Sequence, residues 1–264
     1  MSEKDRNPRR IRSVQHSCAL LRAVQQHDGA TVSELAEDVS LSMGAVHTHL
    51  ATLHEEGLIV KENHKYRLSE QFIIYGDYAR NNSDLFRAGK AVADKLAEET
   101  GESIHLIGEH EGLEVIFYES FGEKAAGTAF YIQNRQNPEL HLHYSAAGKA
   151  ILAHLPESRC EEIIQRYGLV RRTEHTITDE QTLLEELALI RERGFAQNDE
   201  EAIKGVRAIG VPVIGKDQAV IGAISLSAPT TRLQGDDFND TMAHRVMQAA
   251  NVIKINVETK TSPL

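Results

Sequence analysis

Six side chains in the C-terminal two thirds of the chain are of types that bind metals or act as nucleophile and base: His105, His110, His141, His143, Cys160 and His175. Their spacing in the sequence matches neither a metal site nor a nucleophile–base pair. The chain contains no HExxH, CxxC or GxSxG motif, and Cys160 is in a predicted helix rather than at a catalytic turn. The glycines after Gly108 form no phosphate-binding loop. We therefore expect no enzymatic activity, no metal site and no cofactor.

A second set of side chains has the arrangement of a DNA-binding surface. The periodicity of residues 43–56 predicts a helix with an apolar inner face, which leaves His47 and Thr48 on its outer face. Residues 58–69 alternate apolar and polar around Asn63 and His64, which predicts a basic hairpin. Such a helix can read base edges while the hairpin holds phosphates. The expected DNA-contacting residues are Ser42, Gly44, His47, Thr48, Lys61, Lys65 and Arg67.

The elements that would position these residues have clear boundaries. Thr31 and Glu34 form a capping-box sequence at the start of a helix that ends near Val39, and Gly57 is placed to stop the helix over residues 43–56. An earlier helix, capped by Ser13 and ending near His27, would bury a stripe of Val14, Cys18, Leu21 and Val24. Residues 1–69 are therefore predicted to be a winged helix-turn-helix domain. The same fold can also dock a protein.

Charge is unevenly divided along the chain. The formal net charge is −10, but residues 1–69 hold nine Lys/Arg and nine Asp/Glu, so the whole excess of acid lies beyond Ser69. A local positive edge can exist on such a neutral domain. Because the outer face of the helix over residues 43–56 has no Arg or Asn to read bases, we expect weak binding by one copy and a need for two or more.

The remaining pattern predicts a linker and a larger domain. Residues 71–82 and 85–100 read as helices with apolar stripes, suited to a linker, residues 70–84, that also pairs with another subunit. Strands are then predicted at 103–108, 113–119, 128–132, 206–214 and 219–227, with helices near 146–153, 156–167, 179–193 and 236–257. This mixture predicts an α+β sensor-like domain over residues 85–264.

Location and redox state follow from composition. No apolar run approaches membrane-spanning length and residues 1–12 are polar and charged, so we expect a cytoplasmic protein with no membrane contact. Cys18 and Cys160 are the only cysteines and lie far apart in the sequence, so they suggest neither a disulfide nor a zinc finger. Both are predicted to be packed thiols.

The order of motifs along the chain resembles the IclR (isocitrate lyase regulator) family of transcription regulators. After the winged helix and linker helices come LAEETGES, SAAGKAILA, NDEEA, GVPV and AISLSAP, and the similarity covers about residues 11–255. The resemblance implies a GAF-like effector-binding domain with an antiparallel sheet, and homodimers that often pair into tetramers. It also implies small effectors such as organic acids, aromatic acids or sugar-derived acids.

The resemblance also suggests which residues line the effector pocket: Ala146, Ala147, Asn198, Ala208, Ser225 and Ser227. The backbone of Ala146 and Ala147 would hold an effector carboxylate at a helix start. Relatives can have an acid at the position of Asn198 and a cysteine at that of Ala208, so these two departures would leave an uncharged polar cavity. Tight packing of helix on sheet is an equally good reason for the two alanines. Ser225 and Ser227 share one strand face, which could equally face solvent.

These observations predict a sequence-specific, double-stranded-DNA-binding regulator that is controlled by a small carboxylate or sugar-derived effector. Two alternatives remain open. A ligand sensor could act through protein contacts of its winged helix, and a DNA-compacting protein would bind without sequence preference.

Overall fold

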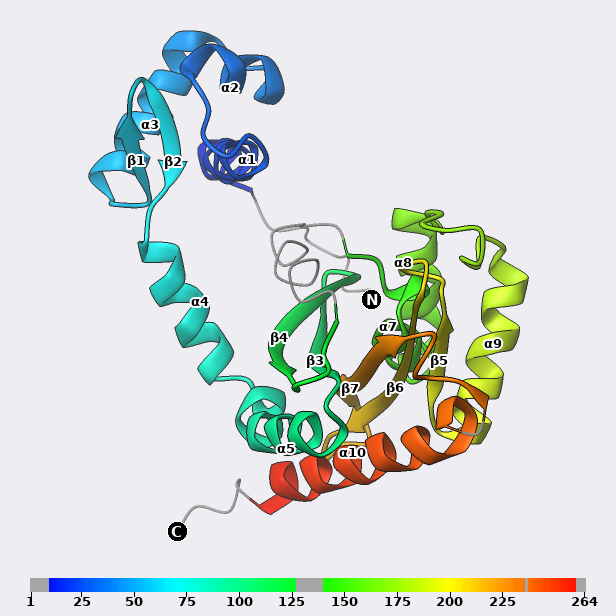
Figure 1. The fold of residues 1–264 in the computed structure, drawn as a ribbon. Helices are drawn as coiled ribbons and strands as arrows, with labels where there is room; N and C mark the ends of the chain where they lie inside the picture. The colour runs from blue at the N-terminus through cyan, green and yellow to red at the C-terminus, as the bar shows by residue number, and fades with distance from the viewer. Residues whose placement is uncertain (1–9, 127–139, 236, 260–264) are drawn as a thin grey trace, which may run out of the picture. The chain divides into compact units, whose positions relative to one another are not determined.

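A computed structural model describes residues 10–126, 140–235 and 237–259 (Figure 1). It divides into two compact units, Met1–Ala79 and Arg80–Leu264. The strand predicted at 128–132 lies outside the described residues. Among the described residues, no helix is both long and apolar enough to cross a membrane.

The first unit is the predicted winged helix. Its elements are α1 (Arg12–Gln26), α2 (Val32–Val39), α3 (Met43–Glu55), β1 (Ile59–Glu62) and β2 (Lys65–Leu68). The capping box is confirmed, because the Thr31 amide donates to the Glu34 carboxylate at 2.8 Å and the Glu34 amide donates to the Thr31 hydroxyl at 3.4 Å. Gly57 follows α3 with a φ of +72°, as expected of a helix stop.

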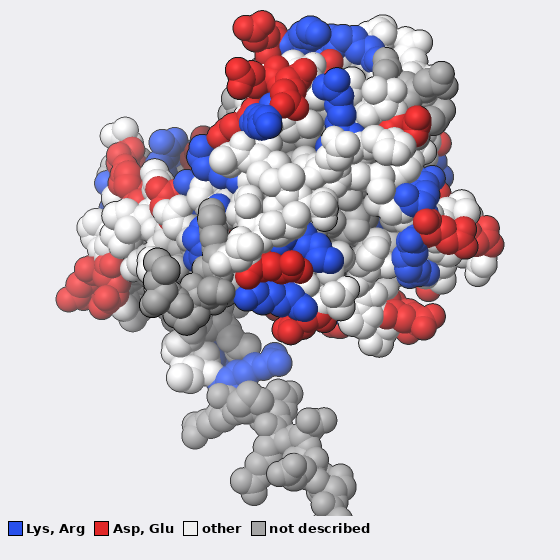
Figure 2. Space-filling model, turned by 90° about the horizontal axis from the view of Figure 1, so that it is seen from below, with Lys and Arg blue, Asp and Glu red and all other residues white. Residues whose placement is uncertain are grey.

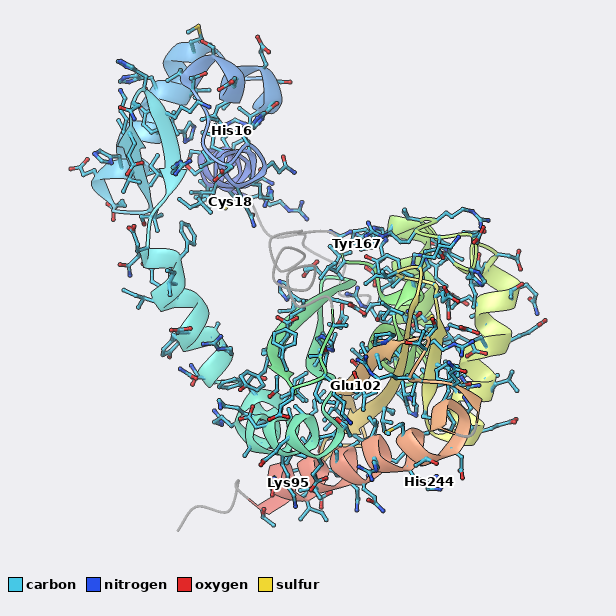
Figure 3. The ribbon with its side chains drawn as sticks, in the orientation of Figure 1. His16, Cys18, Lys95, Glu102, Tyr167 and His244 are labelled. Carbon is cyan, nitrogen blue, oxygen red and sulfur yellow. The ribbon has the colours of Figure 1, made fainter. Side chains whose placement is uncertain are left out.

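The prediction for α1 was partly wrong. The helix begins at Arg12 without a side-chain cap, so Ser13 lies inside it. Its buried face is formed by Leu20, Ala23 and Val24. Val14 and Cys18 are exposed, and Figure 3 shows Cys18 on α1. The helix has two overlapping rows of apolar residues, the predicted one and the one that includes Leu20 and Ala23. The C-terminal half of α1 packs against α2 and α3, and this packing buries the second row.

Two helices follow the hairpin, and the second of them belongs to the second unit. α4 (Gln71–Asn81) has no buried residue. Ser83 then caps α5 (Asp84–Thr100) by accepting from the Phe86 amide, and Gly101 ends it with a φ of +77°. Both helices and the break between them were predicted.

The described residues of the second unit form a five-stranded antiparallel sheet with helices on both faces, which confirms the α+β prediction. The remaining elements are β3 (Ser103–His110), β4 (Leu113–Phe121), a 3₁₀ turn η1 (Leu142–Tyr144), α7 (Ala146–Leu152), α8 (Glu157–Tyr167), α9 (Glu180–Arg193), β5 (Ala196–Asp199), β6 (Val206–Ile214), β7 (Val220–Pro229), a π turn η2 (Asp237–Thr241) and α10 (Met242–Thr259). The strand order is β4-β3-β7-β6-β5. The predicted C-terminal helix therefore begins later than expected, because the π turn takes up residues 237–241.

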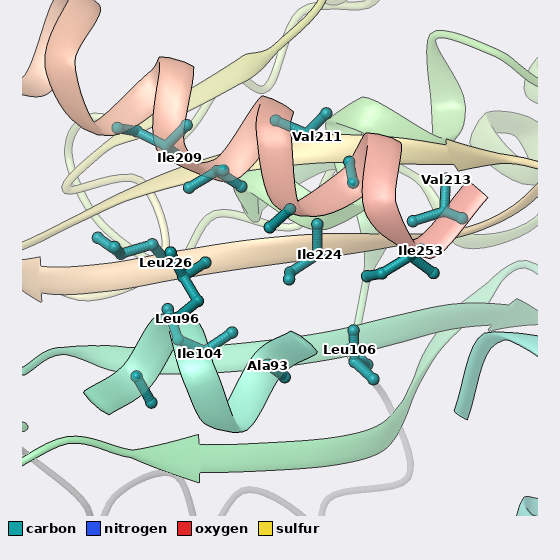
Figure 4. Close-up of a cluster of buried hydrophobic side chains, with 14 of the residues drawn as sticks. Ala93, Leu96, Ile104, Leu106, Ile209, Val211, Val213, Ile224, Leu226 and Ile253 are labelled. Atoms are coloured by element: carbon teal, nitrogen blue, oxygen red, sulfur yellow. The ribbon is translucent and has the colours of Figure 1, made fainter. Parts of the chain in front are cut away.

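The sheet separates two hydrophobic cores. On one face, α5 and α10 pack over β3, β6 and β7, and Figure 4 shows side chains of this core, with Ile104 beside Leu96 and Leu226. On the other face, α7, α8 and α9 enclose a second core that contains Cys160 and Leu187. Acidic and basic side chains are interspersed over the face that Figure 2 presents, so no large area of one sign forms there.

Candidate functional site

The outer face of α3 carries the four helix residues expected to contact DNA. Gly44, His47 and Thr48 are exposed and follow one another at helical spacing. Ser42 is the helix cap, and its Oγ accepts from the Ala45 amide at 3.2 Å, which leaves its hydroxyl hydrogen for an outside acceptor. A methyl group added at Gly44 would meet nothing within 4 Å, so packing does not require glycine at this position.

The hairpin divides its cations between two faces. Asn63 and His64 have φ of +46° and +68°, typical of a type I′ turn. Lys65 and Arg67 lie on one face, and Arg67 is held at the α1–α2 turn, 3.8 Å from the Asp28 carboxylate. Lys61 lies on the other face, 5.2 Å above the ring of Tyr66. Of these three side chains, Lys65 is therefore the one whose charge is most available to bind a DNA phosphate.

The second unit contains a cavity of about 110 Å³ between the sheet and α7. Its walls come from β3, β4, η1, the start of α7, β5, β6, β7, the loop over residues 200–205 and the segment between α8 and α9. The structure brings together in this wall all six residues that the resemblance suggested: Ala146, Ala147, Asn198, Ala208, Ser225 and Ser227.

Strand alternation places the two serines on the cavity side of β7. Ile224 and Leu226 point into the core under α5 and α10, while Ser225 and Ser227 line the cavity and are 5% and 8% exposed. Within the described part of the chain, neither hydroxyl makes a hydrogen bond. The solvent-facing alternative is therefore excluded for both serines.

Tight packing of helix on sheet, the other reason given for the small residues Ala146 and Ala147, is also supported by the structure. A Cβ added at Gly148 would collide with the backbone of Leu142, and one added at Gly210 of β6 would collide with the backbone of Ala146. Ala146 and Ala147 thus lie where α7 packs closely on the sheet, and they line the cavity as well.

The side-chain amide of Asn198 makes two hydrogen bonds within the protein. Its Nδ2 donates to the Tyr144 carbonyl at 2.5 Å, and its Oδ1 accepts from the Glu201 amide at 3.0 Å. These bonds tie the end of β5 to η1 and to the loop that closes the cavity. The second N–H of the amide is the donor that remains for a ligand.

A buried ion pair holds the same loop from the other side. Lys149 of α7 is 1% exposed, and its Nζ donates to Glu201 at 2.5 Å. The hydroxyls of Thr173 and Thr176 donate to the Glu201 carbonyl at 3.2 and 2.7 Å. Burial raises the pKa of Glu201, while the Lys149 ammonium opposes that rise. Residues 198–201 are therefore fixed at several points.

Sequence reasoning missed two charged residues of the cavity wall, Glu114 and Arg172. Ser145 donates to Glu114, and the same Ser145 oxygen accepts from the Gly148 amide at 2.8 Å. Burial raises the pKa of Glu114 to about 8 in spite of these bonds. Arg172 is exposed, with its guanidinium 5.7 Å from the ring centre of Tyr144.

Two of the residues considered for catalysis, Cys160 and His143, are buried in surroundings that keep them uncharged. Burial raises the pKa of Cys160, so its thiol is neutral near pH 7. Burial lowers the pKa of His143 to about 4, and its Nε2 lies 3.0 Å from the Val170 carbonyl. Among the described residues, no three His, Cys, Asp or Glu side chains are grouped to hold a metal ion.

Comparison with known proteins gives consistent matches over both units. Residues 13–63 match the profile described as the IclR helix-turn-helix domain, and residues 78–255 match that of the bacterial transcriptional regulator IclR C-terminal domain. The probable HTH-type transcriptional regulator ArcR of Halobacterium salinarum is 40% identical, covering 96% of each chain. The HTH-type transcriptional regulator KdgR of Dickeya chrysanthemi is 29% identical over 96% of this chain and 82% of its own.

A solved structure shares the fold at lower sequence identity. The crystal structure of an IclR homolog from Microbacterium hydrocarbonoxydans, complexed with 4-hydroxybenzoate, superposes with a TM-score of 0.75. It is 18% identical and covers 93% of this chain and 99% of its own.

Proposed function

The chain belongs to the IclR family of transcriptional regulators, and from that premise we propose that a small carboxylate, bound in the cavity beside α7, controls how its winged helix binds a DNA operator. Residues 1–69 bind DNA, residues 70–84 link the domains, and residues 85–264 bind the effector. The observation that carries the proposal is the meeting of all six expected pocket residues around one cavity.

The lining of the cavity suits a small organic acid. Arg172 supplies a positive charge, and the buried hydroxyls of Ser225 and Ser227 supply donors without partners among the described residues. The apolar side chains of Ile107, Ile116 and other lining residues favour a ligand with a hydrocarbon part. The structural relative that binds 4-hydroxybenzoate supports the same class of ligand.

Operator binding would require two copies of the chain. The outer face of α3 offers no arginine or asparagine, and each hairpin offers few free cations. α4 exposes an apolar surface on which Ile73, Ile74, Tyr75 and Tyr78 are 53–73% exposed. A second copy of α4 would bury this surface and place two winged helices on one stretch of DNA.

DNase footprinting on the DNA that flanks the protein's own gene tests the proposal, with and without a panel of carboxylic acids. We expect a protected site in which the protein concentration for half protection changes when one acid is present. Protection without sequence preference would instead indicate a DNA-compacting protein. Absence of salt-sensitive DNA binding would indicate a sensor that acts through protein contacts.

A further inference from the structure

Glu114 is the acidic residue in the cavity wall, and its position brings it beside the place where an effector carboxylate would lie. One carboxyl oxygen accepts from Ser145, the cap of α7. The same oxygen would be 2.5 Å from a Cβ added at Gly148, so it lies against the first turn of that helix. Within the described residues, the other carboxyl oxygen makes no hydrogen bond.

Among the described residues of the wall, Glu114 is the single acid. The other lining residues are apolar or carry hydroxyl, amide, imidazole or guanidinium groups, with Arg172 as the full positive charge. Ser225 and Ser227 are more than nine-tenths buried, and no hydrogen-bond partner for their hydroxyls occurs in the described chain. These unused donors suit an acceptor-rich ligand, whereas an ionised Glu114 in the wall of the same cavity would repel one.

We propose that the cavity admits a carboxylic acid as its monoanion only when Glu114 carries a proton, so that effector binding is linked to protonation of Glu114. This inference rests on the proposed function, because it concerns the same cavity and the same class of ligand. Glu114 is thereby a specificity-determining residue, which favours monoanions and rejects ligands that place a second negative charge against it.

The hydrogen bonds around Glu114 are consistent with a neutral carboxyl group. Ser145 donates to Oε1, which acts as the carbonyl oxygen, and Oε2 is left to carry the proton and donate it to a ligand carboxylate. Burial already raises the pKa of Glu114 to about 8, far above that of a simple carboxylic acid, so the shared proton stays on Glu114. The charge of a bound carboxylate would raise this pKa further.

Charged and titratable groups surround Glu114 from each neighbouring element. On β3, Glu109 lies opposite Glu114 in the strand register and is paired with Arg159 at 2.8 Å, and His105 lines the same cavity. From η1 come His141 and Tyr144, and from the loop after α8 comes Arg172. Burial raises the pKa of Tyr144 above the ordinary tyrosine value near 10, so this phenol keeps its proton in a series from pH 7 to about 9 that follows Glu114.

Isothermal calorimetry on the full-length protein tests this linkage with formate, acetate, pyruvate and benzoate as probes, since none of them has another titrating group in this range. At least one probe should bind the wild type, with a dissociation constant that rises roughly tenfold from pH 7 to pH 9. Glu114→Gln should give a dissociation constant that does not vary with pH. Ser225→Ala, the matched control in the same wall, should weaken binding at every pH and keep the wild-type profile.

A second measurement does not depend on the variants. At pH 8.5, binding of the same probe to the wild type in two buffers of different ionisation enthalpy should show uptake of more than half a proton per ligand. A wild-type dissociation constant that is flat with pH, no proton uptake, or a rise that persists in Glu114→Gln would overturn the inference and leave the effector site intact. If no probe binds at pH 7, the carboxylate assignment itself is wrong, while footprinting still decides whether the protein binds an operator.

Discussion

Lys65 and His47 occupy positions that separate two kinds of DNA contact. Lys65 is exposed on the hairpin, where it can neutralise a phosphate of any sequence, whereas His47 is on the outer face of α3, where it can meet base edges. Lys65→Ala should therefore weaken binding to all sequences and flatten the slope of log affinity against log salt concentration by about 0.9. Filter binding over a range of salt concentrations measures both effects.

His47→Ala should act differently, by changing the preference between two related operators by about 1 kcal/mol with little change in the salt slope. Lys95→Ala, an exposed change on α5 in the other unit, is the control and should leave both quantities unaltered (Figure 3). If Lys65→Ala and His47→Ala alter affinity and slope alike, this division of roles is wrong.

Glu114 also makes folding stability depend on pH. Its pKa is raised to about 8 in the folded chain from an ordinary value of 4.5, so the folded state holds a proton that the unfolded state releases. The free energy of unfolding should therefore fall between pH 4.5 and 8, with a slope of at most about 1.4 kcal/mol per pH unit from this group.

Glu114→Gln removes this contribution, so its stability relative to the wild type should increase as pH rises through that range. Urea denaturation at pH 5, 6.5 and 8 measures the difference. Equal pH dependence in the two proteins would show that Glu114 ionises normally in the fold.

At the level of elements, the Lys149–Glu201 pair joins α7 to the loop over residues 200–205. Lys149→Met would leave Glu201 buried without its cation, which should cost about 3–5 kcal/mol of unfolding free energy. The double variant Lys149→Met with Glu201→Gln should recover part of that loss. Thermal denaturation of both variants tests this expectation.

The matched control for that pair is an exposed one. Lys95 and Glu99 on α5 are 3.6 Å apart with side chains 76% and 51% exposed, so Lys95→Ala should change stability by less than about 1 kcal/mol. A loss in Lys149→Met as small as in Lys95→Ala would show that the buried pair does not secure the loop.

Local chemistry made most elements predictable from the sequence. Thr31 with Glu34 marks the start of α2, and Gly57 and Gly101 mark the ends of α3 and α5, because each signal depends on neighbouring residues alone. β5 was missed because three of its four residues are Gln197, Asn198 and Asp199, which have little strand propensity. Its pairing with β6 makes it a strand, and that is a tertiary effect.

Only those cavity residues that the family resemblance suggested were predicted from the sequence. Ser225 and Ser227 followed from the motif around them, but Glu114 is a single acid before the apolar run over residues 115–118, and an acid in such a place is ordinarily exposed to solvent. Val115, its neighbour, is instead 38% exposed. Arg172 lies between α8 and α9, where no periodicity indicates which side chains turn toward the sheet. Both residues reach the cavity through contacts between distant segments.

For the whole molecule, the exposed apolar face of α4 gives a test of assembly. Ile74→Glu combined with Tyr78→Glu would put charge on a surface whose side chains are 60% and 73% exposed in one chain. The double variant should fold normally but sediment as a smaller species, and its affinity for the operator should fall at least tenfold because one copy makes few phosphate contacts. Analytical ultracentrifugation and circular dichroism measure these properties.

Asn81→Ala, a change at an exposed polar residue of the same helix, is the control and should leave sedimentation unaltered. Unchanged sedimentation of the double variant would move the subunit interface away from α4.

The position of β7 in the sheet limits how a ligand can be sensed. β7 is hydrogen-bonded to β3 on one side and to β6 on the other, and Ser225 and Ser227 belong to both ladders. A strand paired on both sides can slide only in steps of two residues, about 7 Å, because a one-residue step would turn its side chains to the other face. Each step would break every backbone hydrogen bond to both neighbouring strands. Ligand-induced sliding of β7 is therefore prohibitively costly. The amides of β7 should remain protected from hydrogen exchange when an effector binds, and any motion it causes must begin in the loop over residues 200–205 or move the sheet as a rigid plate.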